Sequence, residues 1–225
     1  MEPLPLDWIA IGVWISLVII TFGISLVLFL KRFKFTEKTK IQLAFCFFFL
    51  SLGIGRAILV YADYFITELI IEQYLYNQVI WKIANFFVIM GLGFLILVSE
   101  YAVFKGKDYY LFTIGYAIVI IIAIFFIQDF YTVQNFTSGA VGFAAFIPIS
   151  YIYLAIKFPM VRRNVILLLG GFLIFGVGLL LISAGIVFVL GGDIHLIYLF
   201  SAIVQIPGLL IMAIAIKRMY FSEKK

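Results

Sequence analysis

The chain has 225 residues, of which 66% are hydrophobic and 12% carry a charge, and its mean hydropathy is +1.23. Soluble domains are about half apolar and a quarter charged, so this composition excludes an ordinary soluble domain and predicts a membrane protein. The net charge of +5 is spread over links between apolar runs, which argues against a nucleic-acid-binding face. The single cysteine, Cys46, excludes a disulfide framework or a thiolate metal site within one chain.

Seven apolar windows follow one another along the chain. Each is near the length of about 20 residues that a helix needs to cross the hydrocarbon core. We expect helices because the lipid interior offers no partners to unpaired backbone groups. The windows are Trp8–Leu30, Ile41–Tyr61, Val79–Phe104, Tyr109–Ile127, Ser138–Ile156, Asn164–Leu190 and Ile194–Ile216. The predicted fold is an all-α bundle of seven transmembrane helices that forms one domain, residues 1–225.

The charges of the links between these windows alternate. Residues 31–40 hold five basic residues and one acidic residue, whereas residues 62–78 hold three acidic residues and no basic one. Fourteen of the sixteen Lys and Arg residues fall on one side, and Arg56 and Lys82 are the exceptions. The positive-inside rule then places the N-terminus outside and the C-terminus in the cytoplasm. We expect a multi-pass protein of the cell membrane whose basic inner face attracts anionic lipids or an acidic partner.

The outer link at 62–78 has an amphipathic pattern. Phe65, Ile66, Leu69 and Ile70 recur at helical spacing beside Glu68. Three structures fit this pattern: a continuation of the second helix, a short amphipathic helix over the outer mouth, or an irregular loop at the headgroup level.

Arg56 is the first candidate functional residue, because an ionisable side chain inside a membrane is costly. It follows Ile41 by fifteen residues, about 22 Å at the helical rise, and so lies in the outer third of the membrane. Asp63 comes two turns later on the same face, and the third helix brings Lys82 and Asn85 to a similar depth. We predict a polar cluster of these four residues beneath the outer surface. It is either a ligand site or a structural pair in which Arg56 extends toward the headgroups and holds Asp63.

Gln205 and Pro207 are the second candidate. Gln205 lies about 16 Å below Ile194, near the midplane of the seventh helix. Pro207 leaves the carbonyl of Ile203 without its helical partner and bends the helix, so the pair is a candidate switch. Pro148 predicts a second, weaker kink in the fifth helix.

The remaining polar residues favour structural roles. Glu100 lies near the inner end of the third helix, where we expect it to meet Lys105 or the basic rim. His195 is the only histidine, which excludes a haem held between paired histidines and gives no metal site. The sequence contains no catalytic motif and implies no cofactor, so we expect a non-enzymatic protein.

Glycines are frequent in the second, third and sixth helices. Small residues let helix backbones approach closely in a membrane, either within one chain or at an interface between two chains. The glycines concerned are Gly55, Gly91, Gly93, Gly170, Gly171, Gly176, Gly178 and Gly185. We favour packing within the chain, and the oligomeric state stays open.

Two families resemble this layout. It resembles microbial rhodopsins, but they attach retinal to a lysine midway along the seventh helix, where this chain has no lysine before Lys217. The stretches GIGRAILVYADYF (53–65) and YLAIKFPMVRRNVILLLGGFLIFGVG (153–178) resemble the seven-helix sensor modules of bacterial and archaeal signalling proteins, including those fused to histidine kinases. That resemblance implies a sensor or receptor-like protein that acts through a cytoplasmic or membrane partner. The alternatives are a small-solute transporter or channel lined by Arg56 and Gln205, and a structural membrane subunit.

Overall fold

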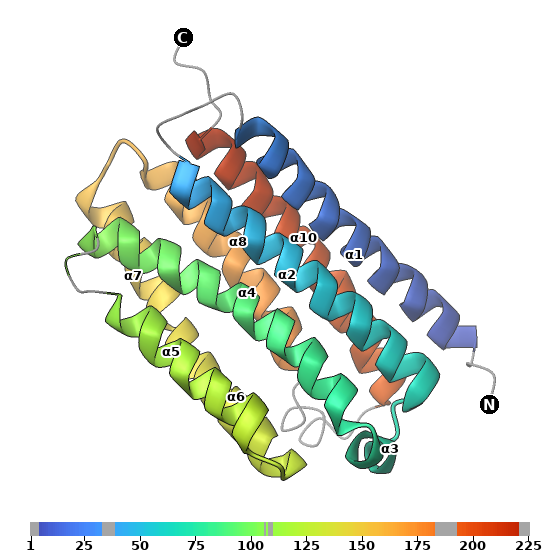
Figure 1. Ribbon diagram of the computed structural model, residues 1–225. Helices are drawn as coiled ribbons and strands as arrows, with labels where there is room; N and C mark the ends of the chain where they lie inside the picture. The colour runs from blue at the N-terminus through green and yellow to red at the C-terminus, as the bar shows by residue number, and fades with distance from the viewer. Residues whose placement is uncertain (1–4, 33–38, 106, 108–109, 183–192, 221–225) are drawn as a thin grey trace.

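Figure 1 shows the computed structural model of the protein, which describes residues 5–32, 39–105, 107, 110–182 and 193–220. All regular secondary structure in these residues is helical, as the sequence predicts. In chain order the elements are α1 (Pro5–Arg32), α2 (Thr39–Tyr61), η1 (Ala62–Ile66), α3 (Ile71–Tyr76), α4 (Gln78–Phe104), α5 (Leu111–Ile121), η2 (Ile122–Phe126), α6 (Phe130–Ala144), α7 (Phe146–Lys157), α8 (Arg162–Leu181) and α10 (Ile194–Tyr220). The segments η1 and η2 are single π-helical turns at the ends of α2 and α5.

Six helical segments are long and apolar enough to cross a membrane. They are Pro5–Leu30, Ile41–Ile66, Gln78–Phe104, Phe130–Lys157, Arg162–Leu181 and Ile194–Met219. A further apolar helix, Leu111–Phe126, is shorter. The protein is therefore a multi-pass helical membrane bundle, and its helices coincide with the predicted windows over most of their lengths. Tyr109 and residues 183–190, which belong to the fourth and sixth windows, lie outside the described residues.

The start of the fifth window differs from the prediction. The window begins at Ser138, whereas α6 begins at Phe130. Polar side chains in its early turns lower the local hydropathy, but the Asp129 carboxylate caps the helix by accepting a hydrogen bond from the Thr132 N–H at 2.7 Å. Hydrogen bonds from Thr132 also hold the pKa of Asp129 below its ordinary value, so the group stays negative beside the positive end of the helix.

The same span is interrupted between α6 and α7, where Ala145 separates the two helices. Pro148 has no N–H and its ring crowds the carbonyl four residues earlier, so a regular helix cannot continue unchanged through this turn. A kink is predicted at Pro148, and the observed break lies about one turn before it, at Ala145.

The two ends of the chain lie at opposite ends of the bundle (Figure 1). We call the end at which α1, α4 and α10 begin the amino end, and the opposite one the carboxyl end. Helix α1 packs against α2 and α10, α2 packs on α4, and α10 packs on α8. Helix α7 contacts both α8 and α4, which closes a ring of six helices, and α5 packs on the outside of α4.

Glycines bring two of these helix pairs close together. A Cβ atom on Gly55 of α2 would lie 2.7 Å from the carbonyl oxygen of Ala84 in α4. A Cβ atom on Gly171 of α8 would lie 2.8 Å from the carbonyl oxygen of Gly208 in α10. Real Cβ atoms do not approach backbone so closely, so the packing depends on glycine at these positions. By contrast, a Cβ on Gly176 would meet nothing within 4 Å.

The link at 62–78, for which the sequence allows three structures, lies at the amino end of the bundle, where α2 ends and α4 begins. Helix α2 continues into the π-helical turn η1, and the short helix α3 follows, so the structure combines two of the predicted alternatives. The Thr67 hydroxyl donates to the carbonyl of Ala62 at 3.1 Å and closes the turn. Glu68 and Leu69 then adopt φ angles of 50° and 57°, a left-handed conformation that reverses the chain toward α3.

Candidate functional site

Arg56 lies inside the bundle and is only 2% exposed. Its Nη2 donates to the side-chain oxygen of Gln205 in α10 at 3.1 Å. Its guanidinium carbon lies 4.9 Å from the centre of the Trp14 ring in α1, within the range of a cation–π contact. The buried charge therefore joins three helices, α1, α2 and α10.

The hydrogen bonds continue from Gln205 into α8. The Gln205 amide nitrogen donates to the Ser201 hydroxyl at 2.8 Å, and that hydroxyl donates to the carbonyl of Gly178 at 2.7 Å. Because the amide oxygen faces a guanidinium and the amide nitrogen faces a hydroxyl, each of these three hydrogen bonds pairs a donor with an acceptor. Arg56, Gln205, Ser201 and Gly178 form one buried chain, which we call the Arg56 chain.

Gly178 leaves the space that this chain occupies. A Cβ atom there would lie 2.5 Å from Cγ of Gln205 and 3.0 Å from the carbonyl oxygen of Ser201. Any larger residue at this position must displace the glutamine that holds Arg56.

Asp63 is also buried, with 6% of its surface exposed, but its hydrogen bond goes elsewhere. The Tyr74 hydroxyl of α3 donates to its carboxylate at 2.6 Å. Burial of Tyr74, and to a lesser extent the nearby Tyr198 and Asp63, raises the pKa of its hydroxyl above the ordinary value. The hydroxyl therefore keeps its proton and remains a donor. Tyr74 thus ties the short helix α3 to the end of α2.

Arg56 and Asp63 therefore do not form the predicted direct pair: Arg56 bonds Gln205, and Asp63 bonds Tyr74. The two residues line one internal space, but no salt bridge between them occurs in the described structure. The reason is geometric. Side chains on a helix lean toward its N-terminus, so Asp63 leans toward Arg56 while Arg56 leans away by the same amount. In α10, which runs the other way, this lean brings Gln205 toward Arg56.

Lys82 and Asn85 form contacts of their own. The Lys82 ammonium donates to the carbonyl of Ile127 at 2.8 Å, at the end of η2, where a cation is favourable. The Asn85 amide donates to the carbonyl of Trp81, one turn earlier in α4, at 3.0 Å. The predicted cluster of four residues therefore divides in two. Arg56 and Asp63 line one space, whereas Lys82 bonds to the end of η2 and Asn85 bonds within α4.

The space around Arg56 is small. No water-sized sphere fits in it. Its lining comes from α1, α2 and η1 and comprises Trp14, Arg56, Leu59, Val60, Asp63 and Tyr64.

Three hydrogen-bond donors that line this space lack acceptors. They are Nε of Arg56, Nε1 of Trp14 and the hydroxyl of Tyr64. The Trp14 and Tyr64 groups approach each other but do not reach the geometry of a hydrogen bond. A buried donor without an acceptor costs about 1–3 kcal/mol. The site therefore combines a guanidinium and spare donors with the Asp63 carboxylate on the same lining, and the spare donors suit a ligand that offers Arg56 an anionic group or a carbonyl oxygen.

Pro207 lies inside α10, and the helix continues through it. The side chain of Gln205 bonds Arg56 and Ser201 rather than the carbonyl of Ile203 that the proline leaves free. Gln205 thus belongs to the buried chain, while Pro207 lies about half a turn further toward the carboxyl end.

Two other polar contacts are structural. Glu100 is fully buried and accepts hydrogen bonds from the Phe112 and Thr113 N–H groups and from the Thr113 hydroxyl, so it caps the start of α5 from the neighbouring helix. His195 Nδ1 lies 2.5 Å from an oxygen of Asp7, which links the starts of α10 and α1. Among the described residues, no group of three or more His, Cys, Asp or Glu side chains could hold a metal ion.

Comparison of the chain with models of known protein families, with curated proteins and with solved structures finds no match. The function must therefore be inferred from the site itself.

Proposed function

We propose that the chain is a non-enzymatic, sensor or receptor-like protein of the cell membrane with seven transmembrane helices. In this proposal the shorter helix Leu111–Phe126 is the seventh crossing, since its sixteen residues span about 24 Å. An odd number of crossings agrees with the start of α1 and the end of α10 lying at opposite ends of the bundle (Figure 1). The charge pattern of the links supports an orientation with the amino end outside and the carboxyl end in the cytoplasm.

The observation that carries the proposal is the set of spare donors around a buried cation. Three donors without acceptors, one on Arg56 itself and two beside it, favour a small ligand that carries a negative charge or a carbonyl oxygen. The space does not admit water in this conformation, so such a ligand enters only if α1 and η1 separate. Ligand binding would thus be coupled to a change in the bundle.

The Arg56 chain supplies the route for that change. A ligand that takes the guanidinium competes with Gln205, which lies on α10, and α10 leads to the carboxyl end. Pro207, one half-turn below Gln205, is a point where the helix bends at low cost. The proposed output is a displacement of the carboxyl end of α10, which a cytoplasmic or membrane partner would detect.

The test measures this coupling without knowledge of the ligand. Spin labels on Tyr101→Cys in α4 and Lys217→Cys in α10 report the distance between two exposed positions at the carboxyl end. The buried Cys46 is first replaced by alanine so that only the two new cysteines are labelled. Arg56→Met, which removes the charge but keeps an unbranched apolar side chain, should shift the distance distribution by about 2 Å, as interface helix shifts do.

The matched control is Ser51→Ala, also in α2. It removes a hydrogen bond to the Phe87 carbonyl of α4 at 2.6 Å but leaves α10 untouched, so the distribution should stay unchanged. Gln205→Leu should reproduce the effect of Arg56→Met, and the double variant should add nothing. If Arg56→Met and Ser51→Ala give the same distribution as the parent, Arg56 is not coupled to α10 and the sensor proposal fails. Flux of a small anion through proteoliposomes that depends on Arg56 would instead favour the transporter.

A further inference from the structure

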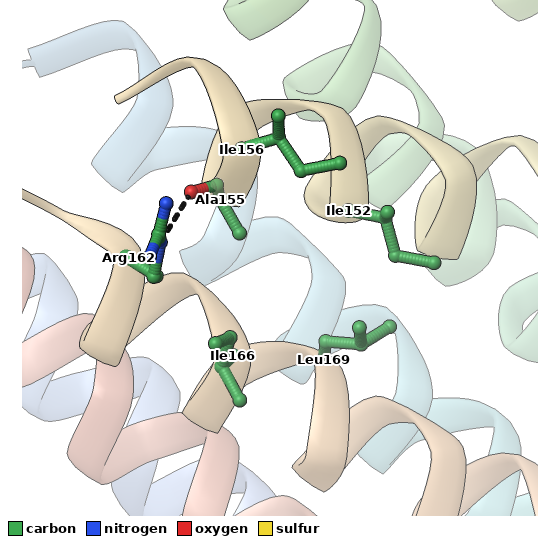
Figure 2. Close-up of a pocket in the computed structure, with 6 residues that line it drawn as sticks. All are labelled: Ile152, Ala155, Ile156, Arg162, Ile166 and Leu169. Atoms are coloured by element: carbon green, nitrogen blue, oxygen red, sulfur yellow. Dashed lines mark hydrogen bonds between the residues drawn. The ribbon is translucent and has the colours of Figure 1, made fainter. Parts of the chain in front are cut away.

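A groove lies between α7 and α8 near the carboxyl end, and it shares no residue with the Arg56 chain. It is open to the surroundings and has a volume of about 250 Å³. Figure 2 shows that its lining residues come from the two facing helices: Ile152, Ala155 and Ile156 from α7, and Arg162, Ile166 and Leu169 from α8.

The groove has an apolar, lipid-facing character. Its residues recur at spacings of three and four, so each helix contributes one face. Ile156 is 70% exposed and Ile166 is 52% exposed, whereas the small Ala155 is buried between them. In a membrane this surface is covered by hydrocarbon, and its shape suits an acyl chain lying along the two helices.

Arg162 stands at the mouth of the groove. Its Nε donates to the carbonyl of Ala155 at 2.9 Å, which fixes the guanidinium between the two helices (Figure 2). That is the one hydrogen bond of this exposed side chain within the described part of the chain, so four of its five N–H donors stay available. The turn that joins the two helices, residues 157–163, also contains Lys157 and Arg163 and has no acidic residue.

The turn itself sets the depth of these charges. Met160 is 99% exposed, and Phe158 and Val161 are 45% and 40% exposed. Apolar side chains at the end of two transmembrane helices insert at the boundary between headgroups and acyl chains. The neighbouring arginines then lie at the level of the lipid phosphates. Helix α8 also begins here without a side-chain cap, which adds a partial positive charge.

We propose that this groove binds one anionic phospholipid, with an acyl chain between α7 and α8 and its phosphate on Arg162 and Arg163. The charge of the turn selects an anionic headgroup, and the groove requires the attached chain. This site is separate from Arg56 and does not depend on the sensor proposal.

Native mass spectrometry of the full chain in detergent, titrated with dioleoyl phosphatidylglycerol, tests the charge requirement. Arg162→Gln should weaken the tightest lipid-binding step about tenfold, the effect of losing one hydrogen bond to a charged group. Arg218→Gln removes another exposed arginine at the carboxyl end of the bundle and should leave that step unchanged. Equal weakening in both variants would mean that the basic face attracts anions in general, which overturns the proposed site.

Three further arms separate the lipid from its parts. Dioleoyl phosphatidylcholine should bind at least tenfold more weakly, and inorganic phosphate should not displace the bound phosphatidylglycerol. Ile166→Trp fills the groove and should abolish the tight step, whereas Leu173→Trp, on α8 but outside the groove and 50% exposed, should retain it. Equal affinity for phosphatidylcholine, displacement by phosphate, or tight binding by Ile166→Trp would each overturn the proposal. Melting of each variant without lipid checks that it is folded.

Discussion

Replacing Gly178 with alanine perturbs the Arg56 chain without touching Arg56. The new methyl group would lie 2.5 Å from Cγ of Gln205 and 3.0 Å from the carbonyl oxygen of Ser201. Alanine in a helix interior gains about 0.5–1 kcal/mol over glycine. Overpacking in a tight core costs about 1–3 kcal/mol, and a lost hydrogen bond between Gln205 and Arg56 adds about 1.5–3 kcal/mol. We expect a net loss of about 1.5–5.5 kcal/mol in unfolding free energy.

Gly176 in the same helix provides the matched control. A Cβ there would meet nothing within 4 Å, so Gly176→Ala should keep the gain in helix propensity and raise the unfolding free energy by about 0.5–1 kcal/mol. The two substitutions are chemically identical and two residues apart, yet the structure predicts effects of opposite sign. Reversible unfolding in mixed micelles, followed by circular dichroism, measures both.

A double-mutant cycle assigns the cost to Gln205. In a Gln205→Ala background the nearest atom to the new methyl is absent, so Gly178→Ala should cost at least about 0.5 kcal/mol less than it does in the parent. If Gly178→Ala is as stable as Gly176→Ala, or if its cost is the same in both backgrounds, α8 and α10 are not packed around this amide as described.

Two other contacts give predictions of similar sharpness. Tyr74→Phe should lower the unfolding free energy by about 1.5–3 kcal/mol because it removes a hydrogen bond to a carboxylate, whereas Tyr76→Phe, at a position 85% exposed, should have no effect. Burial raises the pKa of Tyr74 above the ordinary tyrosine value of about 10, so above that pH Tyr74 ionises only in the unfolded chain. The unfolding free energy should therefore fall as the pH rises above this value. The fall should be less steep in Tyr74→Phe than in Tyr76→Phe. Glu100→Ala removes three hydrogen bonds at the start of α5 and should cost about 3 kcal/mol or more. Hydrogen exchange at the Thr113 amide should accelerate in that variant and much less in Glu100→Gln, which retains an acceptor oxygen.

Hydropathy was enough to locate the helices, because each must satisfy its backbone inside the lipid. It failed where a local contact outweighs composition. The first turns of α6 are too polar for the window that begins at Ser138, but the Asp129 cap starts the helix at Phe130. The short helix α3 depends on the left-handed pair Glu68 and Leu69, a conformation that an amphipathic pattern does not reveal.

The sequence predicted which polar residues belong to the candidate site, but it did not predict which of them form hydrogen bonds with each other. Arg56 and Gln205 stood out because polar groups inside a membrane are costly, yet their hydrogen bond depends on which helices are neighbours. Trp14 and Tyr74 gave no signal, since aromatic residues are common in apolar windows and at membrane interfaces. The direction in which side chains lean along antiparallel helices is the one rule that favours Arg56 with Gln205 over Arg56 with Asp63.

The close packing of α8 on α10 determines how a change at Arg56 can spread. Gln205 cannot swing away within its own helix, because Gly178 and the Ser201 hydroxyl occupy the adjacent space. Almost one turn further along α10, a Cβ on Gly208 would lie 2.6 Å from the backbone nitrogen of Phe175, so the helices have no free space between their backbones there. Tightly packed elements move between discrete arrangements rather than deform continuously. Release of Arg56 should therefore shift α10 relative to α8 in a discrete step, and the carboxyl end of α10, beyond Pro207, is the place where that shift is exposed.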